Sequence, residues 1–359
     1  MAKLRLGVIG AGAWAVTSHL PNFAERADEV EFVGVARKGA DVLAKIKDDW
    51  GFQVASEDYR DVIDAGMDIC LVASPHRFHY EHAKAALEAG AHVLCEKPFT
   101  VDPAHAWELD RIATERGLHL VVSFGWNYMQ AARAAKRLMD EHGIGEIEES
   151  SLRMSSVTRE LLANLGGYPQ AGPDTAPEPE TWTDPRNGGG YGHAQLSHAL
   201  GAALWLTGLR GAAVFALMKA VLDAPVEHHD ACVIQFGNGS IGTMSGASAH
   251  LGALENRHQL ELRVTGSEGE LVVDFGRDVV WLWREDGFEA KPDLAAGALF
   301  YDCDGPPHAL VDLALGKDVE NCSPAELGAR TVEILDAAYR SAASGRLEPV
   351  RGQLAQLTR

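Results

Sequence analysis

A glycine-rich segment near the N-terminus has the residue types and spacing of a phosphate-binding loop. Gly10, Gly12 and Ala15 follow an apolar, strand-like run (residues 4–9) and precede a segment predicted to be helical (residues 17–26). In the pattern Gly-x-Gly-x-x-Gly/Ala, the first glycine permits a sharp turn, the second lets a phosphate approach the backbone, and the third small residue lets the helix pack close to the strand. Free N–H groups at the helix start then attract the pyrophosphate of a dinucleotide. The residues expected at the cofactor here are Gly10, Ala11, Gly12, Ala13, Trp14 and Ala15.

The end of the second predicted strand bears on which dinucleotide is bound. Ala36 stands where NAD-binding proteins usually carry an acid for the ribose 2′-hydroxyl, and Arg37 and Lys38 follow it. Two cations and no carboxylate suit a 2′-phosphate. We therefore expect NADP in preference to NAD, with Arg37 and Lys38 as cofactor-binding residues.

Two more polar segments follow strand-like runs. Residues 74–79 come after the apolar run 67–73, and residues 96–98 come after the run 91–95. In an open α/β sheet, ligands bind outside the carboxyl ends of the strands. Both segments are therefore expected at the cofactor crevice, and the residues assigned to cofactor binding are Ser74, Pro75, His76, His79, Glu96 and Lys97.

The elements that must position these residues change in kind along the chain. The first third alternates short apolar runs with helical segments, which predicts βαβ units and a parallel sheet. From residue 147 onward, alternating strand-like runs dominate and predict a mostly antiparallel sheet. The expected fold is α/β, with a Rossmann dinucleotide-binding domain over residues 1–123. An α+β domain with a large open sheet is expected over residues 124–359, and its last helix over about 324–341.

Taken together and in order, these motifs resemble those of the Gfo/Idh/MocA family, the glucose–fructose oxidoreductase and inositol dehydrogenase group. The residues that carry the resemblance are Gly10–Ala15, His19–Pro21, Ser74–His79, Glu96–Lys97–Pro98, Ile144–Ile147, Gly188–Gly190, His198, Asp230, Phe236–Gly239 and Gly266–Gly269. The resemblance implies NAD(P)-dependent redox chemistry on a sugar, sugar derivative or cyclitol. It also implies a homodimer or homotetramer formed through the C-terminal sheet.

The resemblance further implies that Lys97 and His198 form the catalytic pair. Oxidation of a secondary alcohol needs a base that reaches the hydroxyl and has a pKa matched to the working pH. His198 qualifies by residue type. Lys97 could hydrogen-bond the same oxygen, and a cationic nicotinamide beside it would lower its proton affinity.

The chain departs from the family pattern at residue 194. The family's catalytic helix commonly has Asp there, and this chain has Ala194. A substrate hydroxyl at that position loses its partner unless His193, Gln195 or the loop that bears Trp182 and Arg186 replaces it. We therefore expect a deoxy, substituted or carboxylated substrate, with Arg186 as a candidate carboxylate partner. Residues 166–190, rich in Pro and Gly, are expected to form a lid or binding loop. The predicted substrate-binding residues are Lys97, Trp182, Arg186, His193, Gln195 and His198.

Composition and spacing argue against several other classes. A formal net charge of −19 disfavours nucleic-acid binding, and no apolar run reaches the roughly 20 residues of a membrane span. Five scattered cysteines fit a reduced compartment, so we expect a cytoplasmic protein. His193 and His198 are five residues apart, and adjacent His228 and His229 would point to opposite faces of a strand, so no metal site is expected.

Two alternatives to a dehydrogenase or reductase stay open. One is an NAD-dependent glycosidase of the same fold, which would oxidise, eliminate and re-reduce without consuming its cofactor. The other is a non-catalytic sensor that keeps the fold and the nicotinamide cofactor, which the missing acid at Ala194 favours and which Lys97 and His198 oppose.

Overall fold

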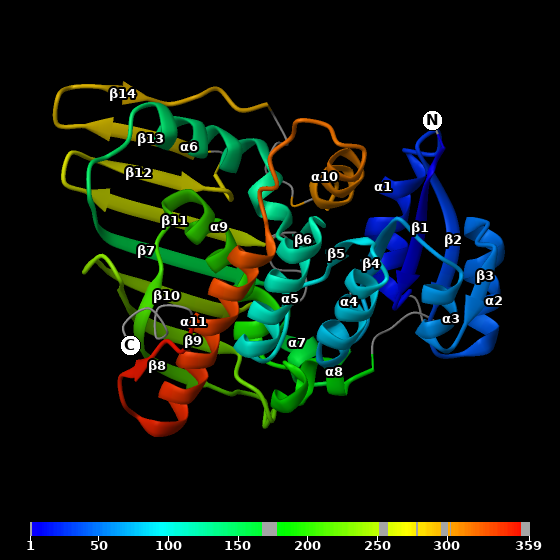
Figure 1. Cartoon of the computed structure of the whole chain (residues 1–359). Coiled ribbons are helices and arrows are strands. Elements are labelled where there is room, and N and C mark those ends of the chain that lie inside the picture. The colour runs from blue at the N-terminus through cyan, green and yellow to red at the C-terminus, as the bar shows by residue number, and fades with distance from the viewer. Residues whose placement is uncertain are drawn as a thin grey trace.

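Two β-sheets, joined by helices between them, organise the molecule (Figure 1). The computed structural model describes residues 2–166, 178–250, 258–277, 279–295, 301 and 303–352. In these ranges we find no helix that combines the length and the apolar character needed to cross a membrane.

The N-terminal sheet has six parallel strands in the order β3-β2-β1-β4-β5-β6. This order reverses direction next to β1, and the carboxyl ends of β1 and β4 flank a crevice there. The strands are β1 (Leu4–Ile9), β2 (Val30–Ala36), β3 (Val54–Ser56), β4 (Ile69–Val72), β5 (His92–Cys95) and β6 (Leu120–Val122). The helices are η1 (Ala15–His19), α1 (Leu20–Ala24), α2 (Ala40–Trp50), α3 (Tyr59–Asp64), η2 (His76–Phe78), α4 (His79–Glu88) and α5 (Pro103–Arg116).

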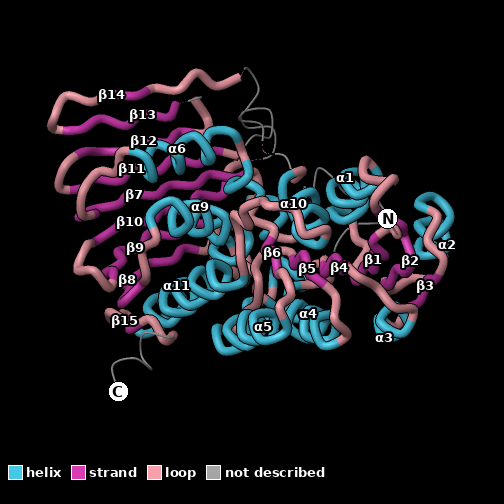
Figure 2. The backbone as a smooth tube through the Cα atoms, turned by 45° about the horizontal axis from the view of Figure 1, so that its top comes forward, coloured by secondary structure: helices cyan, strands magenta, loops and turns pink. Residues whose placement is uncertain are grey.

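Helices cover both faces of this sheet, which explains why β4 is buried along its whole length. Figure 2 shows α3, α4 and α5 on one face and α1 on the other. The second face is completed by α10 (Gly305–Ala314), which comes from far along the chain and packs against β4, β5 and β6. A helix from the C-terminal part of the sequence therefore covers part of the N-terminal sheet. The division of the chain into two domains at residue 123 stays a prediction.

The second sheet has nine strands in the order β14-β13-β12-β11-β7-β10-β9-β8-β15. All neighbouring pairs are antiparallel except β7 with β10, which confirms the expected mostly antiparallel sheet. Its strands are β7 (Ile147–Ser156), β8 (Gly211–Lys219), β9 (His229–Phe236), β10 (Ile241–Ser248), β11 (Gln259–Gly266), β12 (Gly269–Asp274), β13 (Val279–Arg284), β14 (Glu289–Ala290) and β15 (Glu348–Pro349).

One face of this sheet carries helices α6, α9 and α11 (Figure 2). Apart from α10, the helices described in the second half of the chain are η3 (Gly125–Tyr128), α6 (Gln130–Glu141), α7 (Arg159–Leu162), α8 (Glu180–Thr183), η4 (Pro185–Asn187), η5 (Gly192–Leu196), α9 (Ser197–Thr207) and α11 (Ala325–Ser344). Helix α11 packs against α5, α9 and β8, so it ties the two sheets together.

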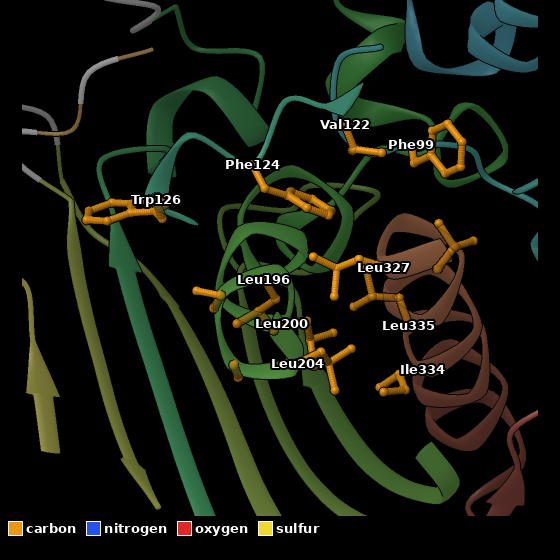
Figure 3. Close-up of a cluster of buried hydrophobic side chains, with 14 of the residues drawn as sticks. Phe99, Val122, Phe124, Trp126, Leu196, Leu200, Leu204, Leu327, Ile334 and Leu335 are labelled. Carbon is orange, nitrogen blue, oxygen red and sulfur yellow. The ribbon is translucent and has the colours of Figure 1, made fainter. Parts of the chain in front are cut away.

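The core between the two sheets fixes the position of α9 (Figure 3). Leu200 and Leu204 of α9 face Leu327 and Leu335 of α11, and the Phe124 ring lies across the start of α9. A Cβ on Gly201 would come within 2.7 Å of the Phe124 ring, so α9 and this ring are packed too closely for a larger side chain at position 201. Side chains on α9 are therefore held at a fixed place relative to the N-terminal sheet.

Candidate functional site

A large cavity lies where the two sheets meet. It has a volume of about 750 Å³, within the range of small-molecule and cofactor sites. Its walls come from the carboxyl ends of β1, β2, β4 and β5, from η5 and α9, and from the segments after β7 and before β11. It therefore combines the switch point of the parallel sheet with residues of the second sheet, as a dinucleotide plus a substrate would require.

The glycine motif forms one end of this cavity. Gly10 has φ +95°, and a Cβ there would overlap the backbone of Ser74, so only glycine fits the turn. Gly12 is different, because a Cβ on it would meet no atom within 4 Å. Gly12 thus opens onto the cavity at the start of η1, where a phosphate can approach the backbone. These residues fit a dinucleotide pyrophosphate.

Arg37 and Lys38 line the same end of the cavity. The Arg37 guanidinium donates to Ala11 O at 3.2 Å and to Lys38 O at 2.9 Å, and Lys38 Nζ donates to Glu57 O at 3.0 Å. The cationic side chains thus lie beside the glycine loop, together with the carboxylates of Glu57 and Asp58.

The polar segments after β4 and β5 meet at the floor of the cavity, as expected for strand ends of one parallel sheet. His79 links them, with Nε2 2.7 Å from Ser74 O and Nδ1 2.8 Å from Pro98 O. Ser74, Pro75, His76 and His79 all line the cavity. Burial lowers the pKa of His79 below its usual value.

Glu96 is held in place by a residue that the sequence analysis did not assign to the site. His19 Nε2 lies 2.6 Å from Glu96 Oε1, while Glu96 Oε2 accepts the Lys97 backbone N–H at 3.0 Å. Burial acts to raise the pKa of Glu96, but the hydrogen bond from His19 and the charges of His19 and Lys97 outweigh it and lower the pKa to about 2. A fixed negative charge therefore lies directly beside Lys97.

The same pair belongs to the only group of three potential metal ligands found in the described part of the chain. His19, Glu96 and Cys303 place one ligand atom each within 4.8 Å of one another. The histidine and carboxylate already hydrogen-bond to each other, and burial raises the pKa of Cys303 to about 12, so its thiol stays protonated. The donor set therefore suits a hydrogen-bonded cluster better than a metal ion.

Lys97 reaches across the cavity to the second half of the chain. Its Nζ donates to Ala194 O at 3.0 Å and lies 5.8 Å from the centre of the Trp182 ring. The acceptor lies in η5, a π-helical turn in which the Ser197 N–H returns to Gly192 O, five residues earlier. The backbone carbonyl at position 194 thus gives Lys97 a partner, although the side chain there carries no acid.

The ammonium group of Lys97 is partly removed from water. Burial lowers the pKa of Lys97, and the negative charge of Glu96 opposes that shift only in part. A lysine in this state can exchange a proton near neutral pH more readily than a lysine at the surface.

His198 stands on the first turn of α9, in the cavity wall. It is 4% exposed and lies edge-to-face with Phe124 (ring centroids 6.4 Å apart) and Tyr301 (5.5 Å). Burial, with a contribution from the charge of Lys97, lowers the pKa of His198 well below its usual value. Its Nδ1 has no hydrogen-bond partner among the described residues, and Ala194, four residues earlier, offers none.

The structure brings some of the predicted substrate residues to the cavity and leaves others outside it. Trp182 and Gln195 line it, and Gln195 Oε1 accepts from Ser156 Oγ at 3.1 Å. His193 instead stacks on Tyr339, with ring centroids 4.5 Å apart, and is not part of the described lining. The Arg186 side chain is 89% exposed and pairs with Asp184 at 2.8 Å, also outside the described lining.

Part of the predicted loop over residues 166–190, including Tyr168, lies outside the described residues. Its described end forms α8 and η4, which carry Trp182 and Arg186. A carboxylated substrate that depends on Arg186 is therefore not supported by the placement of that side chain.

Several cavity residues were missed in the sequence. Tyr301 lies 6.3 Å from Trp14, 4.9 Å from Trp126 and 6.2 Å from His258, measured between ring centroids. Burial lowers the pKa of His258 to about 4. These rings come from separate segments of both halves of the chain, and no local pattern joins them.

The chain was compared with family models, curated proteins and solved structures. Residues 4–124 match the model described as an oxidoreductase family with an NAD-binding Rossmann fold, and residues 132–272 match the GFO/IDH/MocA C-terminal domain. D-glucoside 3-dehydrogenase of Escherichia coli is 32% identical over 153 residues, 42% of this chain and 43% of that protein. Levoglucosan dehydrogenase of Pseudarthrobacter phenanthrenivorans is 23% identical over 309 residues, 77% of this chain and 75% of that protein.

The match spans only about two fifths to a half of the length of several curated relatives. Among solved structures, an oxidoreductase domain protein from Kribbella flavida matches with a TM-score of 0.79 at 20% identity, over 98% of this chain and all of that one. A levoglucosan dehydrogenase complex with NADH and levoglucosan matches with a TM-score of 0.77, also at 20% identity and over the same shares. At this identity, the structural matches establish the fold.

Proposed function

Because the chain belongs to the Gfo/Idh/MocA family of oxidoreductases, we propose that it is an NAD(P)-dependent dehydrogenase or reductase acting on a secondary alcohol or ketone of a sugar, sugar derivative or cyclitol. The observation that carries this proposal is that one cavity joins the glycine motif to Lys97 and His198. Dehydrogenases of a glucoside and of levoglucosan among the relatives support a carbohydrate-like substrate.

Different residues of the cavity would hold the cofactor, position Lys97 and contact the substrate. When bound, the nicotinamide cofactor supplies a two-electron acceptor or donor, and the residues around Gly12 would hold its pyrophosphate. Glu96 keeps a negative charge beside Lys97 and fixes the strand end from which Lys97 projects. Trp182, Trp126 and Tyr301 give apolar walls against which the face of a sugar ring can pack.

We assign proton transfer to Lys97 and orientation of the reacting oxygen to His198, which reverses the roles expected from the sequence. A substrate hydroxyl placed between them can donate to one and accept from the other. The lowered pKa of Lys97 increases the share of its neutral amine, the form that accepts a proton in oxidation, and the lowered pKa of His198 favours its neutral imidazole. His198 then hydrogen-bonds the reacting oxygen and orients it without adding charge.

A substrate panel tests this function directly. Purified protein with NAD or NADP is offered glycosides, anhydro sugars, hexoses, inositols and sugar acids, and the nicotinamide absorbance is followed in both directions. Multi-turnover absorbance change with any of these compounds supports the proposal. Glycoside cleavage without net cofactor change would point to an NAD-dependent glycosidase, and tight cofactor binding without any turnover would point to a sensor; either result overturns the proposal.

We also propose that NADP is preferred over NAD. Arg37→Ala should weaken NADP binding by about 10–100-fold, the scale of a lost hydrogen bond to a charged group, and change NAD binding less than twofold. Titration of both cofactors by calorimetry measures this. Arg111→Ala, which removes an exposed arginine paired with Glu115, is the control. An equal loss for both cofactors, or no loss, would contradict the preference.

The face of the nine-stranded sheet opposite helices α6, α9 and α11 supports the proposed homodimer or homotetramer. Along β8, β9 and β10, buried residues alternate with exposed ones, and Phe215, Leu217, Val233 and Ile241 point away from the helices. Leu217 is 65% exposed, and apolar side chains grouped in this way mark interaction surfaces.

A charge on this face should weaken self-association. Leu217→Glu is expected to shift the protein toward monomer, because an unpaired carboxylate would be buried at the interface. Sedimentation velocity at matched concentrations measures the shift. Val319→Glu places the same charge at an exposed apolar residue after α10 and should change nothing. An unchanged oligomer in Leu217→Glu would show that this face is not the interface.

A further inference from the structure

The start of the helix that carries Ala194 and His198 is capped by residues far away in the sequence. Three successive backbone N–H groups find partners there: Tyr191 N donates to Glu227 O at 3.2 Å, Gly192 N to Glu227 Oε1 at 2.9 Å, and His193 N to Tyr339 Oη at 3.3 Å. These are the groups that a helix leaves unpaired at its N-terminus. No side chain of the helix itself caps them.

The two capping side chains also bind each other. Tyr339 Oη donates to Glu227 Oε1 at 2.6 Å, so Glu227 Oε1 accepts from the helix and from Tyr339 together. The Tyr339 ring stacks on His193 with 18° between the ring planes. Gly190 has φ +103°, and a Cβ there would overlap the Glu227 carboxylate, so the turn is closed tightly over the acid.

A second buried acid accompanies this cap. Asp230 is 4% exposed, and neither of its carboxylate oxygens has a hydrogen-bond partner among the described residues. Burial, and then the charge of Glu227, raises the pKa of Asp230 well above its usual value. Burial raises the pKa of Glu227 as well, but hydrogen bonds from Tyr339 and from the Gly192 N–H oppose that shift, so Glu227 is the better placed of the two acids to hold a negative charge.

We propose that Glu227 and Tyr339 are positioning residues that hold the π-helical turn so that the Ala194 carbonyl meets Lys97. The carbonyl lies two residues beyond Gly192, inside the same turn, and accepts from Lys97 Nζ at 3.0 Å. Neither Glu227 nor Tyr339 belongs to the described cavity lining, so their effect on the reaction passes through the turn. This role rests on the proposed function, because it concerns the geometry of Lys97 in that reaction.

The first test measures the turn in the cofactor-free protein. Glu227→Ala and Tyr339→Phe should each speed amide hydrogen exchange in the peptide spanning residues 191–198, because Gly192 N and His193 N lose their acceptors. Glu227→Gln keeps an acceptor oxygen for Gly192 and should restore most of the protection. Glu333→Ala is the matched control, since it removes a buried acid from the same helix as Tyr339 but one that binds Trp107 Nε1. An unchanged amide exchange rate in Glu227→Ala would show that Glu227 does not cap this helix.

The second test links the turn to the reaction. Glu227→Ala should lower kcat by about 10–100-fold, the scale of an ångström-sized misplacement, and leave the cofactor Kd within about twofold. Glu227→Gln should recover most of that loss. In a Lys97→Met background the same Glu227→Ala change should cost little further, because the contact that it positions is already gone.

The outcomes separate the two ideas. If the wild type turns over no compound, the proposed function fails, while the exchange experiment still decides whether Glu227 and Tyr339 hold the turn. If the wild type turns over substrate and Glu227→Ala keeps full kcat, or if its loss adds fully to that of Lys97→Met, the positioning role is overturned.

Discussion

Replacing Lys97 with methionine is expected to lower turnover by about 10²–10⁴-fold while the protein still folds and binds its cofactor. The substitution keeps the length and apolar stem of the side chain and removes the amine that donates to Ala194 O. Without it, a substrate hydroxyl has no amine to take its proton. Steady-state rates with the best substrate of the panel, alongside the cofactor Kd from fluorescence titration, measure the effect.

Three further variants sharpen this result. Lys84→Met removes a lysine that pairs with Glu108 on the surface and should leave the rate unchanged. Lys97→Arg keeps the positive charge but cannot give up a proton at working pH, so it should be nearly as slow as Lys97→Met. His198→Gln should also lose about 10²-fold or more. Wild-type turnover in Lys97→Met would show that the assignment of the catalytic pair is wrong.

The pH dependence follows from the direction of the two pKa shifts. Because burial lowers the pKa of Lys97, its neutral amine forms at lower pH than in free lysine, and the oxidation rate should rise with pH until that pKa is passed. Because burial lowers the pKa of His198 as well, its imidazole is already neutral at pH 6.5 and adds no second step there. A rate that steps near pH 6.5 would instead point to an unshifted histidine.

The parts of the site that the sequence predicted are those whose chemistry is local. The glycine loop is one strand, one turn and one helix start, so its spacing together with this local context predicts it. Helix α5 is likewise bounded by local signals, because Asp102 caps its N-terminus and Gly117 ends it in a left-handed conformation. Glu96 and Lys97 line the cavity because strand ends of one parallel sheet share an edge, and their contact with a cofactor stays a prediction.

The parts that the sequence did not predict depend on contacts between distant segments. His19 and Glu96 are 77 residues apart, and Glu227 and Tyr339 are 112 apart. Nothing in the local pattern of either partner indicates the other. Helix α10 was missed for a related reason, because the face it buries is formed by strands of the other half of the chain. His193 was placed near the substrate from its neighbours in sequence, whereas the π-helical turn directs its ring toward Tyr339.

The glycine loop offers the prediction with the largest expected effect on cofactor binding. Gly12→Asp should weaken cofactor binding by at least about 100-fold, because a carboxylate would stand in the path of the pyrophosphate, and like charges brought together cost several kcal/mol. The change is a fair test of binding, because Gly12 has no positive φ and a Cβ there meets no atom within 4 Å. Gly10 could not serve, because any side chain there would strain the turn against Ser74.

The matched variant is Gly12→Ala, which adds a methyl group without charge. It should fold equally well and lose much less affinity than Gly12→Asp, since the main penalty comes from the charge and only a part from volume. Calorimetric titration with NAD and NADP measures both variants, and thermal unfolding without cofactor checks that each keeps the wild-type midpoint. If folded Gly12→Asp binds either cofactor as tightly as the wild type, the pyrophosphate does not approach η1. The cavity end formed by Arg37 and Lys38 would then need a different ligand.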